Sequence, residues 1–448
     1  MRESQTLADF VANTEFNDVP AGVTERMQTY VLDSLAAGFV GCRLPWSRIV
    51  HDAERDSGAP GVCSVFGSPT AMSPSSAALV NGAMVGAFET EHSGHTAHPG
   101  GTVPPAALAA AEAAGASGRD LLLACVLGYE VVCRIGDAQT RLVEDERGFH
   151  NPACNGPFSS AAAVGKVLGL DAGRQLSAFG IAGSMSGGLT EFAWNGAMTK
   201  RLHIGLANRA GLQAAYLASR GFTGPGTVLE GQFGYLHAFS PKPRPELLVA
   251  GLGTTWMTLE MKIKPYAAHG TVQAIIAALQ EFKTTHPIRP ADISGVKVRA
   301  STARMLQERF LGARPATLLQ AQLSMPFVIA VALYRDLSDP LQFDESTLAD
   351  EAIRALAASV TWEEIETEDP AFAFLEITAG GTTHEVFAGD YRGSPTMPAQ
   401  WDDVVDKFHR YSRHVLAPER RLRIIATVQA LDTLPDVREL MSLVRSKA

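Results

Sequence analysis

Cysteine is scarce in this sequence, and its pattern argues against a disulfide framework. The chain has five cysteines among 448 residues, and no two of them form a CxxC pair. An odd number of cysteines without paired spacings is not typical of a secreted, disulfide-stapled fold. We therefore expect reduced thiols and a cytoplasmic protein.

Net positive charge and long apolar runs are also lacking. The formal net charge is −9 at pH 7, whereas a nucleic-acid partner favours clustered positive charge, so we expect none. No apolar run reaches the roughly 18 to 20 residues of a membrane span. The charged N-terminus, MRESQTLADFVANTEF, is not typical of a signal peptide. We expect a soluble protein, and an anionic substrate stays open because a few local cations decide that.

The first half of the chain has the pattern of an α-helical domain. Ala, Gly and Leu recur there with helical spacing, which allows close helix packing. The stretch GTVPPAALAAAEAAG places two prolines at a helix start and Gly115 at its end. Ser117 follows as an expected N-cap, with Asp120 in the first turn.

The pattern changes near Thr254, where strand signals begin. GTTWMTLEMKIKPY and ISGVKVRAS alternate like strands, and FAFLEITAGGTTHEVFAG is typical of a hairpin turning at Gly380-Gly381. Helical patterns lie between them, in HGTVQAIIAALQEF and TLLQAQLSMPFVIAVALYRD. The sequence thus predicts a mainly α protein. An all-helical domain covers residues 1–254, a smaller α+β domain covers 255–399, and residues 400–448 return to the helical domain.

Three histidines crowd the segment HSGHTAHPGG. His92, His95 and His98 follow Glu89 and Glu91 at the end of an apolar helix. A polar loop, a zinc site and acid–base machinery are the three interpretations. Pro99 and the glycines after it indicate that no helix continues through His98, so the spacing is not a recognised ligand frame.

Three further polar clusters contain residue types used in catalysis or binding. GFHNPACNG holds His150, which is equally well interpreted as a capping or core histidine. NGAMTKRLHIGLANRAG holds Lys200, Arg201 and His203, and a lysine there is often a solvated surface residue. MKIKPYAAHG places Lys264, Tyr266 and His269 at an expected strand-to-helix junction, where a helix N-terminus favours a carboxylate.

The four clusters taken together favour proton transfer on a carboxylate substrate. They supply histidines and lysines, whereas no nucleophile motif or glycine-rich phosphate loop is found. A proton next to a carboxylate is only weakly acidic, so a base needs cations that stabilise the dianion. Lysines can supply that charge, and we expect no metal and no organic cofactor.

These segments resemble the MmgE/PrpD family. The resemblance rests on HPGGTVPPAALAAAE, GFHNPACNGPFSSAAAVGKVLGL, TKRLHIGLANRAGLQAAYLASRGFTGP, KPYAAHGTVQA and YRGSPTMPAQWDDVVDKF, which follow one another along nearly the whole chain. The family contains 2-methylcitrate dehydratase, cis-aconitate decarboxylase and iminodisuccinate epimerase. It implies a homodimer, a large helical domain, a smaller α+β lid domain and a cofactor-independent site in the cleft between them.

The resemblance also implies site residues. His98, His150, Lys200 and Lys264 correspond to catalytic positions of the family, and its acidic residues fall around Glu89 and Glu91. We expect Glu89 to orient one imidazole, while His92 and His95 lie in a variable loop. Lys200 and Lys264 would hold substrate carboxylates, with the remaining expected substrate contacts at Tyr266, His269, Ser93 and Glu91.

Two departures from the family pattern bear on the reaction. Glu91-His92-Ser93 stands where the lyases of the family show a run such as Asp-Asp-Thr, and Phe327 stands where they carry a tyrosine. Loss of these groups favours an iminodisuccinate-like epimerase, which needs only a base on one face, an acid on the other and no leaving group. The alternatives are a dehydratase or decarboxylase of the same family, a non-catalytic carboxylate-binding protein, and a structural helical dimer.

Overall fold

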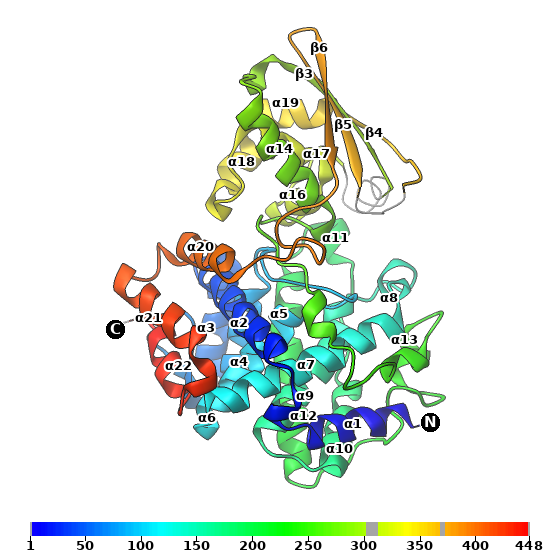
Figure 1. Cartoon of the computed structure of the whole chain (residues 1–448), viewed down its shortest axis with the longest axis vertical. Helices are drawn as coiled ribbons and strands as arrows, with labels where there is room; N and C mark the ends of the chain where they lie inside the picture. Colours follow the sequence, from blue (N-terminus) through cyan, green and yellow to red (C-terminus); the bar gives the residue numbers. More distant parts are fainter. Residues whose placement is uncertain (1, 302–311, 368–371, 447–448) are drawn as a thin grey trace. The chain divides into compact units, whose positions relative to one another are not determined.

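The structure is a computed structural model that describes residues 2–301, 312–367 and 372–446 (Figure 1). It divides into two compact units. The first comprises Met1–Thr190, Thr199–Lys262 and Gln400–Ala448, and the second comprises Glu191–Met198 and Ile263–Ala399. The junction therefore follows Lys262, whereas the sequence pattern placed it after Thr254, and a short segment near residue 195 joins the second unit.

Helices build the first unit, and small residues bring the central ones together. Any side chain at Gly205 of α12 would meet the Leu79 carbonyl of α4, and any at Gly211 would meet the Pro157 carbonyl of α9. These glycines therefore let α12 lie against both helices with backbones in near contact. The helices are α1 (Glu3–Asn13), α2 (Ala21–Gly41), α3 (Pro45–Ser57), α4 (Pro74–Val85), α5 (Pro99–Thr102), α6 (Pro104–Ala114), α7 (Gly118–Gln139), α8 (Leu142–Asp145), α9 (Asn151–Val167), α10 (Ala172–Ser184), α12 (Thr199–Ser219), α13 (Tyr235–Phe239), α20 (Trp401–Ser412), α21 (Pro418–Gln429) and α22 (Arg438–Val444).

The predicted helix boundaries around residue 115 are confirmed. Helix α6 starts at Pro104 and ends at Ala114, and the next residue, Gly115, caps it with a φ of 64°, the left-handed conformation that glycine adopts readily. Ser117 and Asp120 form a capping box at the start of α7, because each side chain accepts a hydrogen bond from the other residue's backbone N–H. The C-terminal helices also return to the first unit, where α20 lies against α2 (Figure 1).

Two predictions for the first unit are wrong in detail. The unit is not all-helical, because β1 (Pro60–Ser64) and β2 (Ala71–Met72) form a small antiparallel pair. The strand predicted in GTTWMTLEMKIKPY is replaced by a 3₁₀ helix, η3 (Met257–Glu260). Buried side chains of α7 bind this segment instead of a sheet: Glu130 accepts hydrogen bonds from Thr258, and Arg134 donates to the carbonyl of Thr255.

The second unit is α+β, as the sequence predicts. Its sheet has the order β4-β3-β5-β6, with β3 and β4 parallel and the other neighbours antiparallel. Figure 1 shows helices over one face of this sheet. The strands are β3 (Ile293–Ala300), β4 (Val360–Glu363), β5 (Ala373–Ala379) and β6 (Thr382–Ala388), and the helices are α11 (Phe192–Asn195), α14 (Gln273–Thr285), α16 (Leu318–Leu323), α17 (Met325–Tyr334), α18 (Glu345–Ala349) and α19 (Glu351–Ser359).

The hairpin and the helical segments of the second unit follow the sequence closely. Strands β5 and β6 turn at Gly380 and Gly381, whose φ angles of 57° and 84° fit a tight two-residue turn. The helical stretch predicted over TLLQAQLSMPFVIAVALYRD is two helices, because Ser324 ends α16 and caps α17 with its side chain.

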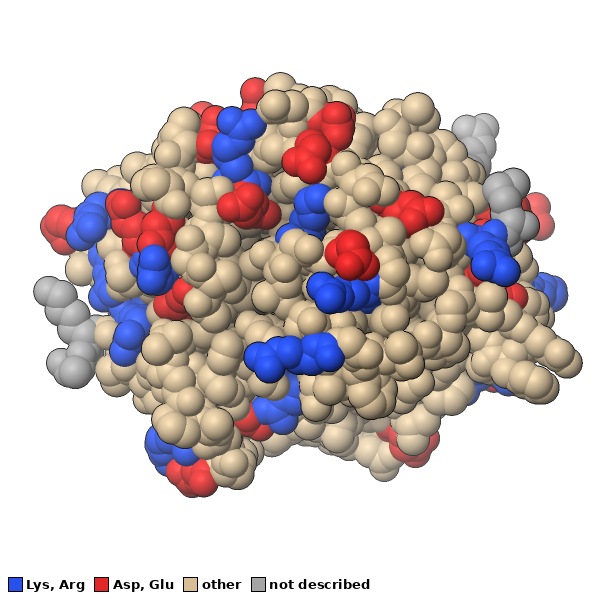
Figure 2. Space-filling model, turned by 90° about the horizontal axis from the view of Figure 1, so that it is seen from below, with Lys and Arg blue, Asp and Glu red and all other residues tan. Residues whose placement is uncertain are grey.

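Charges of both signs lie on the face of the molecule that Figure 2 shows. On the face shown in Figure 2, Lys and Arg side chains alternate with Asp and Glu over a largely uncharged surface. Among the helices of the described residues, none is long and apolar enough to cross a membrane.

Replacing Gly136 by alanine is expected to destabilise the first unit by about 1–3 kcal/mol, as overpacking does. A Cβ at this position of α7 would lie 1.8 Å from the carbonyl oxygen of His95. Gly22→Ala in α2 is the matched control, because its Cβ meets nothing within 4 Å. Urea unfolding of both variants tests this, and equal stability of the two would contradict it.

Candidate active site

A polar loop between α4 and α5 carries four of the nine predicted site residues, Glu89, Glu91, Ser93 and His98. Helix α4 ends at Val85 and α5 begins at Pro99, so the loop, called the His98 loop here, comprises residues 86–98. Glu89, His95 and Thr96 have positive φ angles of 58°, 51° and 56°. A residue with a Cβ adopts this conformation only where its surroundings hold it, and such positions cluster at functional sites.

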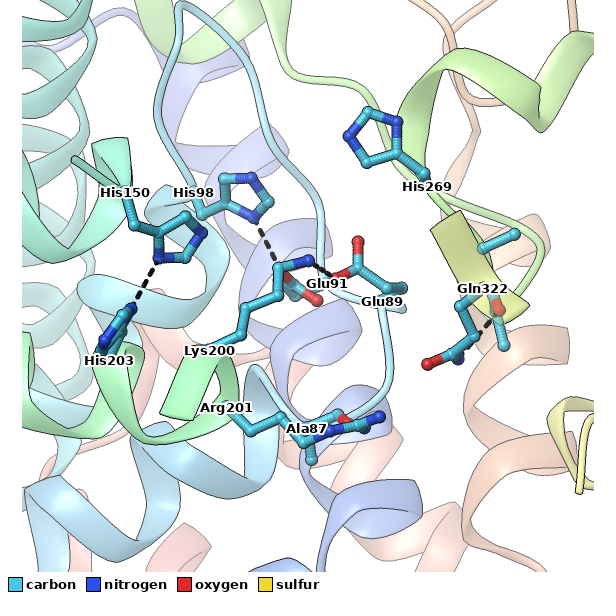
Figure 3. Close-up of polar contacts among 12 residues, drawn as sticks. Ala87, Glu89, Glu91, His98, His150, Lys200, Arg201, His203, His269 and Gln322 are labelled. Carbon is cyan, nitrogen blue, oxygen red and sulfur yellow. Dashed lines mark hydrogen bonds and ion pairs between the residues drawn. The ribbon is translucent and has the colours of Figure 1, made fainter. Parts of the chain in front are cut away.

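His98 is paired with a buried carboxylate. Its Nδ1 lies 2.7 Å from Oε1 of Glu91, whose side chain is 3% exposed, while the imidazole is 24% exposed (Figure 3). The carboxylate places a proton on Nδ1 and fixes the ring orientation. Nε2 is then the nitrogen that can exchange a proton with a substrate. We assigned this orienting role to Glu89 from the sequence, and the structure gives it to Glu91.

Lys200 and Glu89 form the second charged pair. Lys200 lies in the first turn of α12, and its ammonium forms an ion pair with Glu89 Oε1 (Figure 3). The two side chains are 11% and 4% exposed. The alternative of a solvated surface lysine is therefore wrong, since the charge is held inside the unit by a carboxylate of the His98 loop.

His150 and His203 form a neutral pair in the same unit. His150 is the N-cap residue of α9, but its Nδ1 faces His203 Nδ1 at 3.1 Å instead of capping the helix. Burial, with the neighbouring His203 and His98, lowers the pKa of His150 well below its usual range. Burial and the charge of Lys200 lower the pKa of His203 to about 4. One ring therefore donates and the other accepts at neutral pH.

His203 and Arg201 are site neighbours that the sequence analysis did not assign. His203 could have been found by spacing, because positions i and i+3 of α12 place it on the same helix face as Lys200. Arg201 has no such signal. Its guanidinium lies over the Trp46 ring, 3.7 Å from the centroid, and donates to the Ala87 carbonyl at the start of the His98 loop. Burial lowers the pKa of Arg201 to about 9.

The three histidines of the His98 loop have three separate partners. His98 contacts Glu91, whereas His92 Nδ1 lies 2.7 Å from Asp33 and His95 Nδ1 lies 2.9 Å from Asp137. Their nitrogens thus do not converge on one point. Within the part of the chain that the structure describes, no group of three or more His, Cys, Asp or Glu side chains is placed to hold a metal ion. His92 lies in the loop, as expected, and its side chain is fully buried.

Ser93 is fixed through its backbone. Its N–H donates to the carbonyl of Lys262 at 3.1 Å and its carbonyl accepts from the Lys262 N–H at 2.7 Å. This two-bond bridge joins the His98 loop to the last residue of the first unit's middle segment. The contact holds the loop in place without using the Ser93 hydroxyl.

Lys264, Tyr266 and His269 lie together in the second unit. Lys264 is 1% exposed. The segment after it is tied to α14 and α16, because Gln273 donates to the Ala268 carbonyl at 2.8 Å and the His269 N–H donates to the Gln322 carbonyl at 3.0 Å. His269 caps the 3₁₀ turn η4 (Gly270–Val272) with its ring, so the expected helix N-terminus is present although the strand before it is not.

A histidine paired with a carboxylate can serve as an acid or base, and a lysine can stabilise negative charge. An enzyme that moves protons next to carboxylates uses such groups. Comparison with protein families identifies the chain. Residues 5–248 match the MmgE/PrpD N-terminal domain, and residues 266–433 match the MmgE/PrpD C-terminal domain. The chain belongs to the MmgE/PrpD family.

Named relatives of the chain are similar over nearly its whole length. The cis-aconitate decarboxylase-like protein oryM of Aspergillus oryzae is 30% identical, over 98% of this chain and 96% of its own. The cis-aconitate decarboxylase of Aspergillus terreus is 30% identical, over 98% of this chain and 94% of its own. The human cis-aconitate decarboxylase is 27% identical, over 94% and 90% of the two chains. The relatives thus carry the name of a lyase.

The neutral histidine pair predicts a loss of stability in mild acid. An unfolded histidine has a pKa of about 6.5, so the unfolded chain binds more protons than the folded one as the pH falls from that value toward the lowered pKa values of His150 and His203. The contribution of this pair to the free energy of unfolding is therefore fully present above about pH 6.5. Below that pH the free energy of unfolding decreases, by up to about 1.4 kcal/mol per pH unit for each histidine.

Urea unfolding at several pH values in this range measures the slope of the free energy of unfolding against pH. His203→Asn is expected to reduce it, because one of the two protonation steps is removed. His237→Gln, on an exposed histidine of α13, is the matched control and should leave the slope unchanged. An unchanged slope in His203→Asn would contradict the assignment.

Proposed function

We propose that the protein is a lyase that decarboxylates a small unsaturated tricarboxylate of the cis-aconitate type. The observation that carries the proposal is the contact of His98 with the buried carboxylate of Glu91, in the same loop as the carboxylate that pairs with Lys200. The names of the relatives support the same reaction class. This replaces the epimerase as the main hypothesis.

Decarboxylation of such a substrate needs an electron sink and a proton. The carboxymethyl group of cis-aconitate lies next to a carbon–carbon double bond that is conjugated with a second carboxylate. When the bond to CO2 breaks, its electron pair forms a new double bond, and the old one becomes an enolate of that second carboxylate. A proton delivered to the carbon beside this carboxylate completes the reaction. The balance is one CO2 released and one proton taken up.

His98 has the properties of the proton donor in this scheme. Glu91 stabilises its imidazolium through Nδ1, so Nε2–H can be given to the enolate carbon. Lys200 is proposed to hold a substrate carboxylate while it keeps Glu89, since an ammonium has three donors. Its positive charge stabilises the enolate as charge develops. Lys264 is proposed as a second carboxylate-binding lysine, with Tyr266 and His269 beside it in sequence.

The two premises that favoured an epimerase are weakened by the structure. Phe327 is fully buried, with its ring against Phe343 at 6.3 Å between centroids, so the phenylalanine serves packing inside the second unit. Glu91 does not remove a carboxylate from the site, because it contacts His98 directly. Neither departure therefore argues against lyase chemistry.

One NMR experiment separates the candidate reactions. Purified protein incubated with cis-aconitate in deuterium oxide is expected to release CO2 and to give a product with a terminal methylene group and one deuterium on the neighbouring CH2. Hydration without CO2 release would identify a dehydratase. Failure to release CO2 from cis-aconitate, together with deuterium uptake and inversion in iminodisuccinate, would reject the proposal in favour of an epimerase.

His98→Gln is expected to lower kcat roughly 100-fold or more, the usual scale for a lost acid–base group, with KM little changed. The matched control is His237→Gln, the same change at an exposed histidine in the same unit. Lys264→Ala should instead raise KM and lower kcat together, because a bound carboxylate loses its cation. Steady-state kinetics tests both. Near wild-type kcat in a stably folded His98→Gln would reject the role of His98.

A further inference from the structure

A chain of buried polar side chains lies behind the His98 loop. Lys407 Nζ donates to Asp33 Oδ1 at 2.6 Å, and Asp33 Oδ2 lies 2.7 Å from His92 Nδ1. His92 Nε2 lies 2.5 Å from the Tyr129 hydroxyl. None of these four side chains is more than 3% exposed. The groups come from α20, α2, the loop and α7, so four separate parts of the first unit meet here.

The pKa shifts of these buried side chains indicate which group donates in each hydrogen bond. Burial lowers the pKa of His92 and raises that of Tyr129, so the imidazole and the phenol are both neutral. Burial opposes the charge of Asp33, but Lys407 and His92 outweigh it and lower its pKa. The carboxylate therefore accepts from Nδ1–H, and Nε2 accepts from the tyrosine hydroxyl. Lys407 and Asp33 thus form an ion pair, and the neutral His92 and Tyr129 extend it by two further hydrogen bonds, each with one direction.

These buried polar side chains hold the His98 loop at two positions, Thr90 and His92. Lys407 Nζ also donates to the carbonyl oxygen of Thr90 at 2.7 Å, and His92 is held through its ring between Asp33 and Tyr129. Glu91 lies between these two fixed points, and Glu89 precedes the first. The buried anchors are thus residues 90 and 92, while residues 89 and 91 hold Lys200 and His98.

We propose that Lys407, Asp33, His92 and Tyr129 form a positioning network, which fixes residues 90 and 92 so that Glu91, between them, meets His98. The inference rests on the proposed function of His98 and Lys200. It also gives a role to the C-terminal return, because Lys407, 317 residues from Thr90 in sequence, binds the His98 loop through the Thr90 carbonyl. Its effect on turnover passes through Glu91.

A double-mutant cycle in kcat tests whether the effect passes through Glu91. Lys407→Met is expected to lower kcat by up to about 100-fold, the scale of a small misplacement of a catalytic group. In a Glu91→Gln background the same change should lower kcat by less than about threefold, because the pair it positions is already lost. Independent, multiplying effects in the two backgrounds would overturn the proposal.

Glu112→Gln is the matched control for a purely structural role. Glu112 is a buried carboxylate of the same unit that accepts two hydrogen bonds from Ser64, at 2.6 Å each. Its replacement should lower stability and leave kcat unchanged in both backgrounds. If Lys407→Met does not fold, Tyr129→Phe carries the test, because it removes one hydroxyl and keeps the ring that stacks near Tyr30. Its smaller loss of kcat should likewise disappear with Glu91→Gln.

Amide hydrogen exchange gives a readout that does not need turnover. Lys407→Met should speed exchange in residues 89–98 while α6 keeps its wild-type protection. If the wild type fails to decarboxylate cis-aconitate but this local effect is seen, the proposed function fails and the positioning network stands. Equal acceleration throughout the first unit, or none in residues 89–98, would overturn the positioning network.

Discussion

Two carboxylates buried at the end of an apolar helix are the constraint that organises this molecule. Glu89 and Glu91 are 4% and 3% exposed, and a carboxylate removed from water must be paired or lose its charge. Lys200 pairs with Glu89, and His98 pairs with Glu91. The two pairs therefore stabilise the folded loop, and removing one partner would leave the buried group of the other without its contact.

The packing of the helices follows from the same need. Lys200 reaches Glu89 from the first turn of α12, so this helix must come close to the end of α4. Glycines at their contact permit it, since a Cβ at Gly205 would lie 2.3 Å from the Leu79 carbonyl and one at Gly86 would lie 2.6 Å from Ile204. Small residues that first indicated only dense helix packing thus also set the distance between the lysine and its carboxylate.

Local signals in the sequence predicted the helix ends and the hairpin turn correctly, whereas contacts between residues far apart in sequence could not be predicted. Pro104, Ser117 and the Gly380-Gly381 turn act on their neighbours, so their effects are visible within a few residues. The burial of His92 depends on Asp33 and on Lys407, which is 374 residues from Asp33 in sequence. No local pattern contains that contact. The choice between Glu89 and Glu91 as the partner of His98 escaped for the same reason, because both are polar residues of one loop and only the folded backbone separates them.

A decarboxylase and an epimerase of this family would make similar demands on the first unit. Each forms electron density on a carbon beside a carboxylate and then adds a proton there, so each uses a cation and an imidazolium held in fixed positions. They differ in what leaves the substrate: CO2 in one case, a proton in the other. Loss of CO2 requires no base, so a single well-placed acid suffices. His98 is paired with a carboxylate, whereas His150 and His203 pair with each other. The proposed decarboxylase needs one acid, whereas an epimerase needs two opposed acid–base groups.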